Sequence, residues 1–92
     1  MMTVVETQIE VVNKLGLHAR AAAKLVNVAN QFEAAIWLSK DGQVANVKSI
    51  MTLLMLAAAK GSWLTLRCEG DDAEAATSQI AQLFKDCFGE GG

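Results

Sequence analysis

Apolar and polar side chains alternate near the start of the chain, and this period of two is typical of a β-strand with one buried face. The alternation spans residues 5–12 and returns in residues 63–68. In the first segment the residues that would face the core are Val5, Thr7, Ile9 and Val11. In the second segment they are Leu64, Leu66 and Cys68. Both segments are therefore predicted to be strands.

Two further strands are predicted in the middle of the chain, joined by a tight turn. Residues 35–39 and 44–47 have strand character, and Asp41-Gly42 lies between them. An Asp-Gly pair is favoured at the centre of a two-residue β-hairpin turn, because both positions need a positive φ. The two segments are therefore predicted to form an antiparallel hairpin.

Three other segments place apolar residues three or four positions apart, which is the spacing of an amphipathic helix. The first runs over residues 18–30, and the second follows Ser49, a natural N-cap. Lys60 and Gly61 supply a basic last turn and a terminal glycine, so the second helix is expected to end there.

The third helix is expected to open with Asp-Asp-Ala-Glu at residues 71–74, a variant of the capping box, and to end at Gly89. The side chains that it would bury are Ala73, Ala76, Ile80, Leu83, Phe84 and Cys87.

The predicted order is β-α-β-β-α-β-α within one domain that covers residues 1–92. An antiparallel sheet with helices packed on one face buries the apolar sides of all these elements together, so we expect an α+β fold. This pattern leaves the order of the strands open. Trp37 and Trp63 lie opposite the core-facing residues of their strands and are expected to be partly exposed on the open face.

Composition narrows the class of protein. The 92 residues are 52% hydrophobic and 20% charged, a globular profile, and the formal net charge of −2 disfavours a nucleic-acid binder. The longest nearly apolar run, residues 50–59, is half a membrane span, and residues 1–6 do not resemble a secretory signal, so we expect a cytoplasmic protein without membrane insertion. Cys68 and Cys87 fit neither a zinc site nor a disulfide framework and are expected to be apolar fillers.

The residues with the clearest chemical potential lie at the start of the first helix. Gly16 precedes the only histidine, His18, and Arg20 follows it. The backbone N–H groups of a first helical turn have no internal partners and bind anions, and the positive end of the helix dipole favours a neutral, nucleophilic imidazole. Arg20 could offer a planar set of donors to phosphate oxygens. A single histidine at a helix start is more often a capping or solvated residue, and this physical reasoning alone favours that simpler role.

Two stretches of sequence favour the phosphate role. Residues 13–20 read Asn-Lys-Leu-Gly-Leu-His-Ala-Arg, and residues 47–56 read Val-Lys-Ser-Ile-Met-Thr-Leu-Leu-Met-Leu. These stretches resemble the active-site signature and the regulatory-serine signature of the histidine-containing phosphocarrier proteins, the HPr family of the bacterial phosphoenolpyruvate-dependent phosphotransferase system. Gly61 and residues 69–76 also fit, so the resemblance covers nearly the whole chain.

The resemblance implies a role for each matched residue. His18 resembles the family's phosphohistidine, which carries phosphate on Nδ1, and Arg20 resembles its phosphate-coordinating arginine. Phosphate would arrive from Enzyme I and pass to an enzyme IIA domain, with no cofactor besides the transient phosphoryl group. The family fold is an open-faced β-sandwich with a four-stranded antiparallel sheet and three helices on one face. We expect a relay protein and not an enzyme with its own turnover, and we expect a monomer.

One position departs from the family pattern. Proline usually follows the arginine, and this chain has Ala21. Proline in a first helical turn fixes φ without the loss of a needed hydrogen bond, whereas alanine favours the helix but leaves the unfolded chain more freedom. The site is expected to survive the change, with an effect on kinetics or choice of partner.

Ser49 has two possible roles. As an N-cap it would stabilise its helix by about 1 kcal/mol. By resemblance it could also be phosphorylated by an HPr kinase/phosphorylase, and a dianionic group there would obstruct a docking surface. The resemblance places that docking surface on the first two helices. The residues that we expect to contribute to it are Leu17, Ala21, Ile50, Met51 and Leu54.

Three alternatives to a sugar-system carrier stay open. The first is a carrier of the nitrogen-related regulatory branch, favoured by Ala21 and by the apolar density of residues 47–56. The second is a non-covalent regulatory module with the same fold, against which the presence of both His18 and Arg20 argues. The third, an RNA-binding sheet, would need more basic residues around Trp37 and Trp63.

Overall fold

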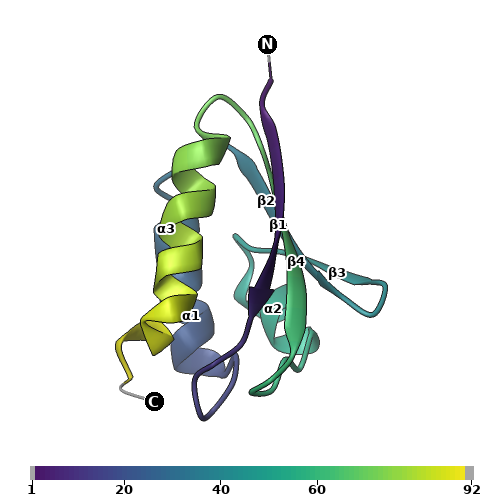
Figure 1. Ribbon diagram of the computed structural model, residues 1–92, viewed down its shortest axis with the longest axis vertical. Helices are drawn as coiled ribbons and strands as arrows, with labels where there is room; N and C mark the ends of the chain where they lie inside the picture. The colour runs from purple at the N-terminus through teal and green to yellow at the C-terminus, as the bar shows by residue number, and fades with distance from the viewer. Residues whose placement is uncertain (1, 91–92) are drawn as a thin grey trace.

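The computed structural model describes residues 2–90, in which the helices cover one face of a single antiparallel sheet (Figure 1). The strands are β1 (Val4–Glu10), β2 (Ala35–Lys40), β3 (Gln43–Asn46) and β4 (Trp63–Glu69). The helices are α1 (Ala19–Ala29), α2 (Ile50–Met55) and α3 (Ala73–Lys85), with a 3-10 turn η1 (Cys87–Gly89) after the last. The expected element order and the open-faced α+β architecture are both confirmed.

The strands lie in the order β1-β4-β2-β3, so the last strand in sequence is inserted between the first two. Cys68 of β4 lies opposite Val5 of β1 on one side and Ile36 of β2 on the other. The predicted hairpin joins β2 to β3 through Asp41 and Gly42, whose φ angles of 51° and 85° are both positive, as a type I′ turn needs.

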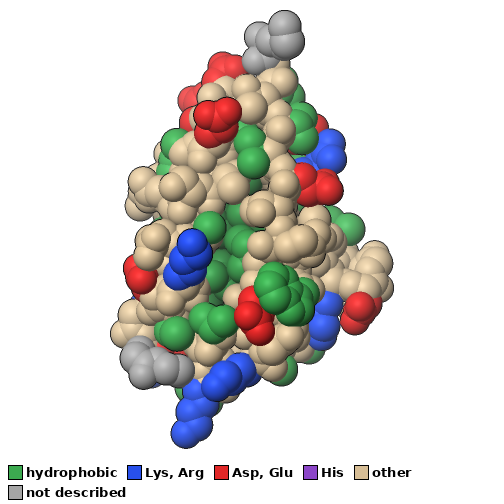
Figure 2. Space-filling view, viewed as in Figure 1, with side chains coloured by type: hydrophobic (Ala, Val, Ile, Leu, Met, Phe, Trp, Pro, Cys, Tyr) green, Lys and Arg blue, Asp and Glu red, His purple; other side chains and the backbone are tan. Residues whose placement is uncertain are grey.

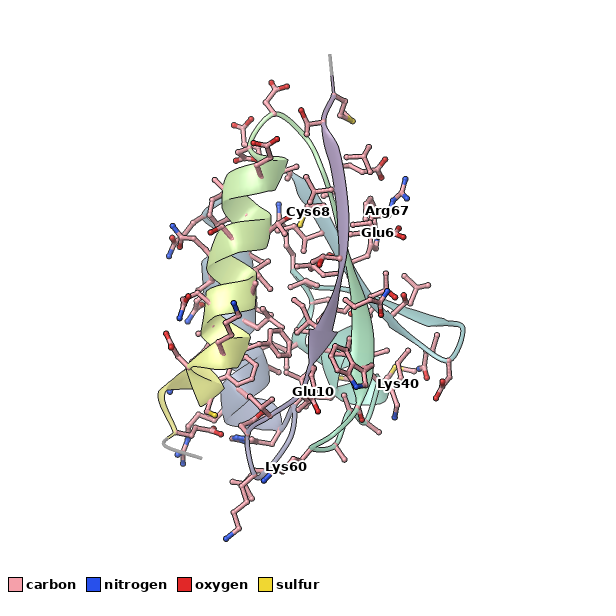
Figure 3. The ribbon with its side chains drawn as sticks, in the orientation of Figure 1. Glu6, Glu10, Lys40, Lys60, Arg67 and Cys68 are labelled. Atoms are coloured by element: carbon pink, nitrogen blue, oxygen red, sulfur yellow. The ribbon has the colours of Figure 1, made fainter. Side chains whose placement is uncertain are left out.

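The two faces of the sheet differ as the alternation predicts. Leu64, Leu66 and Cys68 of β4 are buried under the helices, while Arg67 is exposed on the other face. Figure 3 shows Cys68 pointing toward α3 and Arg67 pointing the opposite way, beside Glu6. Trp63 on the open face is 60% exposed, and Trp37 is half-buried, as expected.

The core lies between this sheet and helices α1 and α3, which run side by side (Figure 1). Figure 2 shows hydrophobic side chains gathered in a hollow between α3 and β1. The residues that line this hollow include Ile9, Trp63, Ala81 and Phe84. Cys68 is a buried free thiol within the core, and burial raises its pKa, which suits the expected role of an apolar filler.

Helix α2 is shorter than the sequence indicates, and the predicted end at Lys60 and Gly61 is wrong. The helix ends at Met55, and Ala57 has a left-handed φ of 49°. The alanines of residues 57–59 favour a helix by themselves, but Ala58 turns inward and is buried, and its carbonyl accepts a hydrogen bond from Leu17 N–H at 2.8 Å. Tertiary contacts therefore override local propensity here.

The predicted capping box at the start of α3 is also wrong. Asp72 is the N-cap residue, but its side chain makes no cap hydrogen bond. Its carboxylate accepts hydrogen bonds instead from the backbone N–H groups of Glu33 and Ala34, both at 2.9 Å. Asp72 thus joins the start of α3 to the residues that precede β2.

The end of α3 differs from expectation as well, because the helix stops at Lys85 and not at Gly89. Cys87 and Phe88 both have a φ of 53°, so the chain turns back on itself after the helix. Phe88 is buried against Phe84, with ring centroids 4.8 Å apart, while Cys87 is only half-buried. This turn carries the last described residue, Glu90, back toward α1.

Candidate functional site

The loop before α1 is fixed in place by close backbone contact with the segment after α2. Gly16 has a φ of 67°, and a Cβ atom at this position would lie 2.6 Å from the carbonyl oxygen of Ala58. Only glycine fits such an approach. Leu17 N–H donates to the same carbonyl, so the loop reaches the start of α1 in a defined geometry.

His18 is the N-cap of α1 and not its first helical residue. Its backbone is extended, with φ −82° and ψ 179°, and its carbonyl accepts a hydrogen bond from Ala22 N–H at 2.8 Å. The N–H groups of Arg20 and Ala21 belong to the first helical turn, where no helical acceptor is available and the helix dipole is positive. The side chain of His18 is therefore attached to the chain beside a helix end that can bind an anion.

Arg20 lies in this first turn with its side chain exposed, and it makes no hydrogen bond to any side chain or backbone group of residues 2–90. Its guanidinium is therefore available to an anion at the helix start. The structure thus brings His18 and Arg20 to the same helix end, as the sequence predicts.

No pattern in the sequence indicates which residue contacts the imidazole. Glu90, 72 positions later in the chain, places its Oε2 atom in hydrogen-bond contact with His18 Nε2. The His18 side chain is 25% exposed and that of Glu90 is 10% exposed. A lone acidic residue after Gly89 carries no signal in the sequence, because the contact depends on the reversal of the chain after α3.

Asn13 connects this carboxylate to the loop before α1. It is wholly buried, and its Nδ2 donates to Gly16 O at 2.7 Å and to Glu90 Oε1 at 3.1 Å. The segment after α3, residues 86–90, is called the tail here. Lys24 Nζ of α1 donates a hydrogen bond to Phe88 O in this tail at 2.6 Å. Helix α1 and the loop before it therefore hold Glu90 against the histidine.

Electrostatics keep this carboxyl group ionised. Partial burial raises the pKa of Glu90, but the hydrogen bonds from Asn13 and His18, with the charges of His18 and Lys24, outweigh it and lower the pKa below the usual value for glutamate. At neutral pH Glu90 is therefore a carboxylate that accepts hydrogen bonds and donates none.

A patch of exposed apolar side chains lies on α2, which contacts α1. Met51 is 71% exposed, and the patch also includes Ile50, Leu54 and Met55. Two of the predicted docking residues need a correction, because the side chains of Leu17 and Ala21 are buried in the core. Leu17 lies in the loop before α1 and Ala21 in its first turn, and both side chains face inward. Of the predicted set, only Ile50, Met51 and Leu54 have exposed side chains.

Ser49 caps α2, as predicted. Its backbone is extended, and its hydroxyl oxygen accepts a long hydrogen bond of 3.5 Å from Thr52 N–H. Thr52 in turn donates from its hydroxyl to Asn46 O at 2.8 Å, which ties the first turn of α2 to β3. Ser49 is partly exposed at this helix start, and its phosphorylation remains a prediction.

Residues 2–90 contain no group of three or more His, Cys, Asp or Glu side chains arranged to hold a metal ion. Within the same residues, no helix has the length and apolar character needed to cross a membrane.

Comparison with known proteins shows what this chain is similar to. A family model described as "PTS HPr component phosphorylation site" matches residues 5–86. The phosphocarrier protein HPr of Neisseria meningitidis is 47% identical over 83 residues, which cover 90% of this chain and 93% of that protein. The phosphocarrier protein NPr of Shewanella violacea is 43% identical and covers 97% of this chain and 98% of its own length.

Solved structures show the same relationship. The crystal structure of HPr-C-His from Thermoanaerobacter tengcongensis has a TM-score of 0.90 and 43% identity, and the match covers 94% of this chain and 97% of that one. The phosphocarrier protein HPr from Bacillus anthracis has a TM-score of 0.83 and 44% identity, with 87% and 95% covered. Another structure from Thermoanaerobacter tengcongensis is described as an HPr dimer, so the expected monomeric state of this chain stays a prediction.

Proposed function

Because the chain belongs to the HPr family of phosphocarrier proteins of the phosphotransferase system, we propose that it accepts a phosphoryl group on His18 Nδ1 from Enzyme I and passes it to an enzyme IIA domain. The observation that carries the proposal is the position of His18 as N-cap of α1, with the side chain of Arg20 exposed in the same turn. Such a carrier acts in the cytoplasm, needs no cofactor, and holds the phosphoryl group only between two partners.

The chemistry follows from this arrangement. The lone pair of Nδ1 attacks phosphorus, a P–N bond forms, and the bond between phosphorus and the donor breaks with its electron pair left on the donor. Arg20 and the free N–H groups of the first helical turn stabilise the negative charge on the phosphoryl oxygens. The reverse sequence, with the enzyme IIA domain as acceptor, returns the imidazole to its starting state.

The exposed apolar patch on α2, defined above as Ile50, Met51, Leu54 and Met55, supplies a docking surface for both partners. Methionine is flexible and polarizable, so a methionine-containing patch adapts to more than one partner surface. Phosphorylation of Ser49 by an HPr kinase/phosphorylase would place a dianion at the edge of this patch and weaken docking.

The test is incubation with phosphoenolpyruvate, Mg²⁺ and Enzyme I. The wild-type chain is expected to gain one acid-labile phosphoryl group, and His18→Ala is expected to gain none. Asn27→Ala, an exposed change on the same helix, serves as the matched control and should be labelled like the wild type. Labelling of His18→Ala at the wild-type rate would exclude this function.

A second candidate acceptor follows from the similarity to the NPr of Shewanella violacea. In that case the chain serves the nitrogen-related regulatory branch, and its acceptor is a regulatory enzyme IIA. Parallel transfer assays from the phosphorylated chain to a sugar-specific and to a regulatory enzyme IIA distinguish the two branches by which acceptor is labelled faster. A chain that accepts no phosphoryl group but still binds such partners would instead be a non-covalent regulatory module.

A further inference from the structure

The contact between Glu90 and His18 has no role in the transfer steps described above. We propose that Glu90 and Asn13 are positioning residues that hold the resting imidazole in the tautomer protonated on Nε2, so that Nδ1 keeps the lone pair that attacks phosphorus. This inference rests on the proposed function for its consequence, although the tautomer itself is a property of the protein alone.

The orientation of the Asn13 amide is fixed by its surroundings. Both partners of its amino group, Gly16 O and Glu90 Oε1, are acceptors, so the amino group must face them. This orientation leaves the buried Oδ1 atom of Asn13 without a hydrogen-bond partner within residues 2–90. The unpaired oxygen costs free energy, and the two hydrogen bonds from the amino group offset that cost. The hydrogen bond to the Glu90 carboxylate is the charge-assisted one of the two.

The state of Glu90 then determines the state of the imidazole. One carboxylate oxygen is occupied by Asn13, and the other contacts His18 Nε2. An ionised carboxylate has no proton to donate, so the proton of this hydrogen bond resides on Nε2. In a neutral imidazole only one nitrogen carries a proton, so Nδ1 is left as the nucleophile.

The tail holds the carboxylate in place by contacts away from the imidazole. Phe88 is buried beside Phe84, and its carbonyl accepts from Lys24 Nζ. Glu90 is therefore two residues beyond an anchored position. During transfer the Nε2 proton stays where it is, the ring gains positive charge as the P–N bond forms, and the carboxylate stabilises that charge.

A substitution of Glu90 by glutamine tests this arrangement sharply. Glutamine has a single oxygen, and Asn13 Nδ2 requires an acceptor, so the Gln amino group would turn toward Nε2 and donate to it. Nε2 would then lose its proton, and Nδ1 would become protonated. Glu90→Ala removes the contact without replacing it, so the two tautomers should both be populated.

The experiment is a long-range ¹H–¹⁵N correlation spectrum of ¹⁵N-labelled protein at alkaline pH, where imidazole is neutral. Wild type and the control Asp86→Asn, which changes an exposed carboxylate in the same tail, should show the pattern of the Nε2-protonated ring. Glu90→Gln should show mainly the Nδ1-protonated ring, and its phosphorylation rate should fall about tenfold or more, as when an amide replaces the carboxylate behind a catalytic histidine.

In the double variant Asn13→Ala/Glu90→Gln, the glutamine is free to turn, and the Nε2-protonated ring should recover. The spectra also show whether each variant is folded, so a folding defect is recognised as such. A wild-type ring protonated on Nδ1, or Glu90→Gln with the wild-type tautomer, would overturn the inference. Because the spectra need no Enzyme I, a failure of phosphorylation would count against the proposed function and leave the tautomer result intact.

Discussion

At the scale of single residues, the site depends on Gly16 and Glu90 as much as on His18. Gly16 allows the loop to approach the segment after α2, and Glu90 reaches the imidazole from the far end of the chain. Neither residue supplies the reacting atom. Gly16 acts through the position of its backbone, and Glu90 acts through the position of its carboxylate.

Gly16→Ala should destabilise the protein by about 2 kcal/mol or more, because it combines a positive φ with a Cβ contact of 2.6 Å to Ala58 O. Gly42→Ala is the matched control, since Gly42 has a φ of 85° but open space around it. It should cost about 1 kcal/mol, from backbone strain alone. Urea unfolding measures both, and equal effects would show that the close approach to Ala58 is unimportant.

The pH dependence of stability should reveal Glu90. Its pKa is lower in the folded protein than the ordinary value of 4.5, so its contribution to the free energy of unfolding is present above pH 4.5 and is lost as the pH falls through the lowered pKa. Wild type should therefore be more stable than Glu90→Gln at pH 7, and this difference in stability should shrink as the pH falls below 4.5. Urea midpoints at several pH values measure this, and a constant difference would contradict it.

At the scale of elements, the alternation of the strands, the Asp41-Gly42 turn and the Ser49 cap could be predicted because each signal is local to its own segment. The ends of α2 and α3 could not, because contacts with other segments determine them. Residues 57–59 have helical propensity but are held by Leu17, and Asp72 binds the residues before β2 in place of its own helix.

Asp72→Ala should lower the urea midpoint, because it leaves the N–H groups of Glu33 and Ala34 without their acceptor. The pKa of Asp72 is lowered mainly by its hydrogen bond from Glu33 N–H, so the effect should be largest at neutral pH. Asp71→Ala removes an exposed neighbouring carboxylate and should have a smaller effect. Equal midpoints for the two variants would contradict a joining role for Asp72.

Helix α2 should govern docking more than stability. Met51→Glu places a charge in the exposed apolar patch and should raise the KM of Enzyme I for the carrier about tenfold, with little change in the urea midpoint. Val44→Glu on β3 introduces the same charge at another exposed apolar position and should leave the KM unchanged. Similar KM values for both variants would place the docking surface elsewhere.

At the scale of the whole molecule, the order of the strands sets the arrangement of the sheet, and the tail returns to place Glu90 beside His18. The order β1-β4-β2-β3 depends on which strands fit together in three dimensions, and an alternating pattern carries no information about it. The resemblance in the sequence predicts roles for His18 and Arg20, because their signature is contiguous. Glu90 was missed because its contact spans 72 positions and depends on the left-handed turn at Cys87 and Phe88.

His18 is proposed to carry phosphate on Nδ1 between two partners. The most direct measurement is NMR of the ¹⁵N-labelled chain after incubation with phosphoenolpyruvate, Mg²⁺ and Enzyme I, with ³¹P–¹⁵N coupling used to locate the phosphoryl group. One phosphoryl group is expected, bonded to Nδ1 of His18 and lost when an enzyme IIA acceptor is added. A phosphoryl group on Nε2 or on another residue, or none at all, would contradict it.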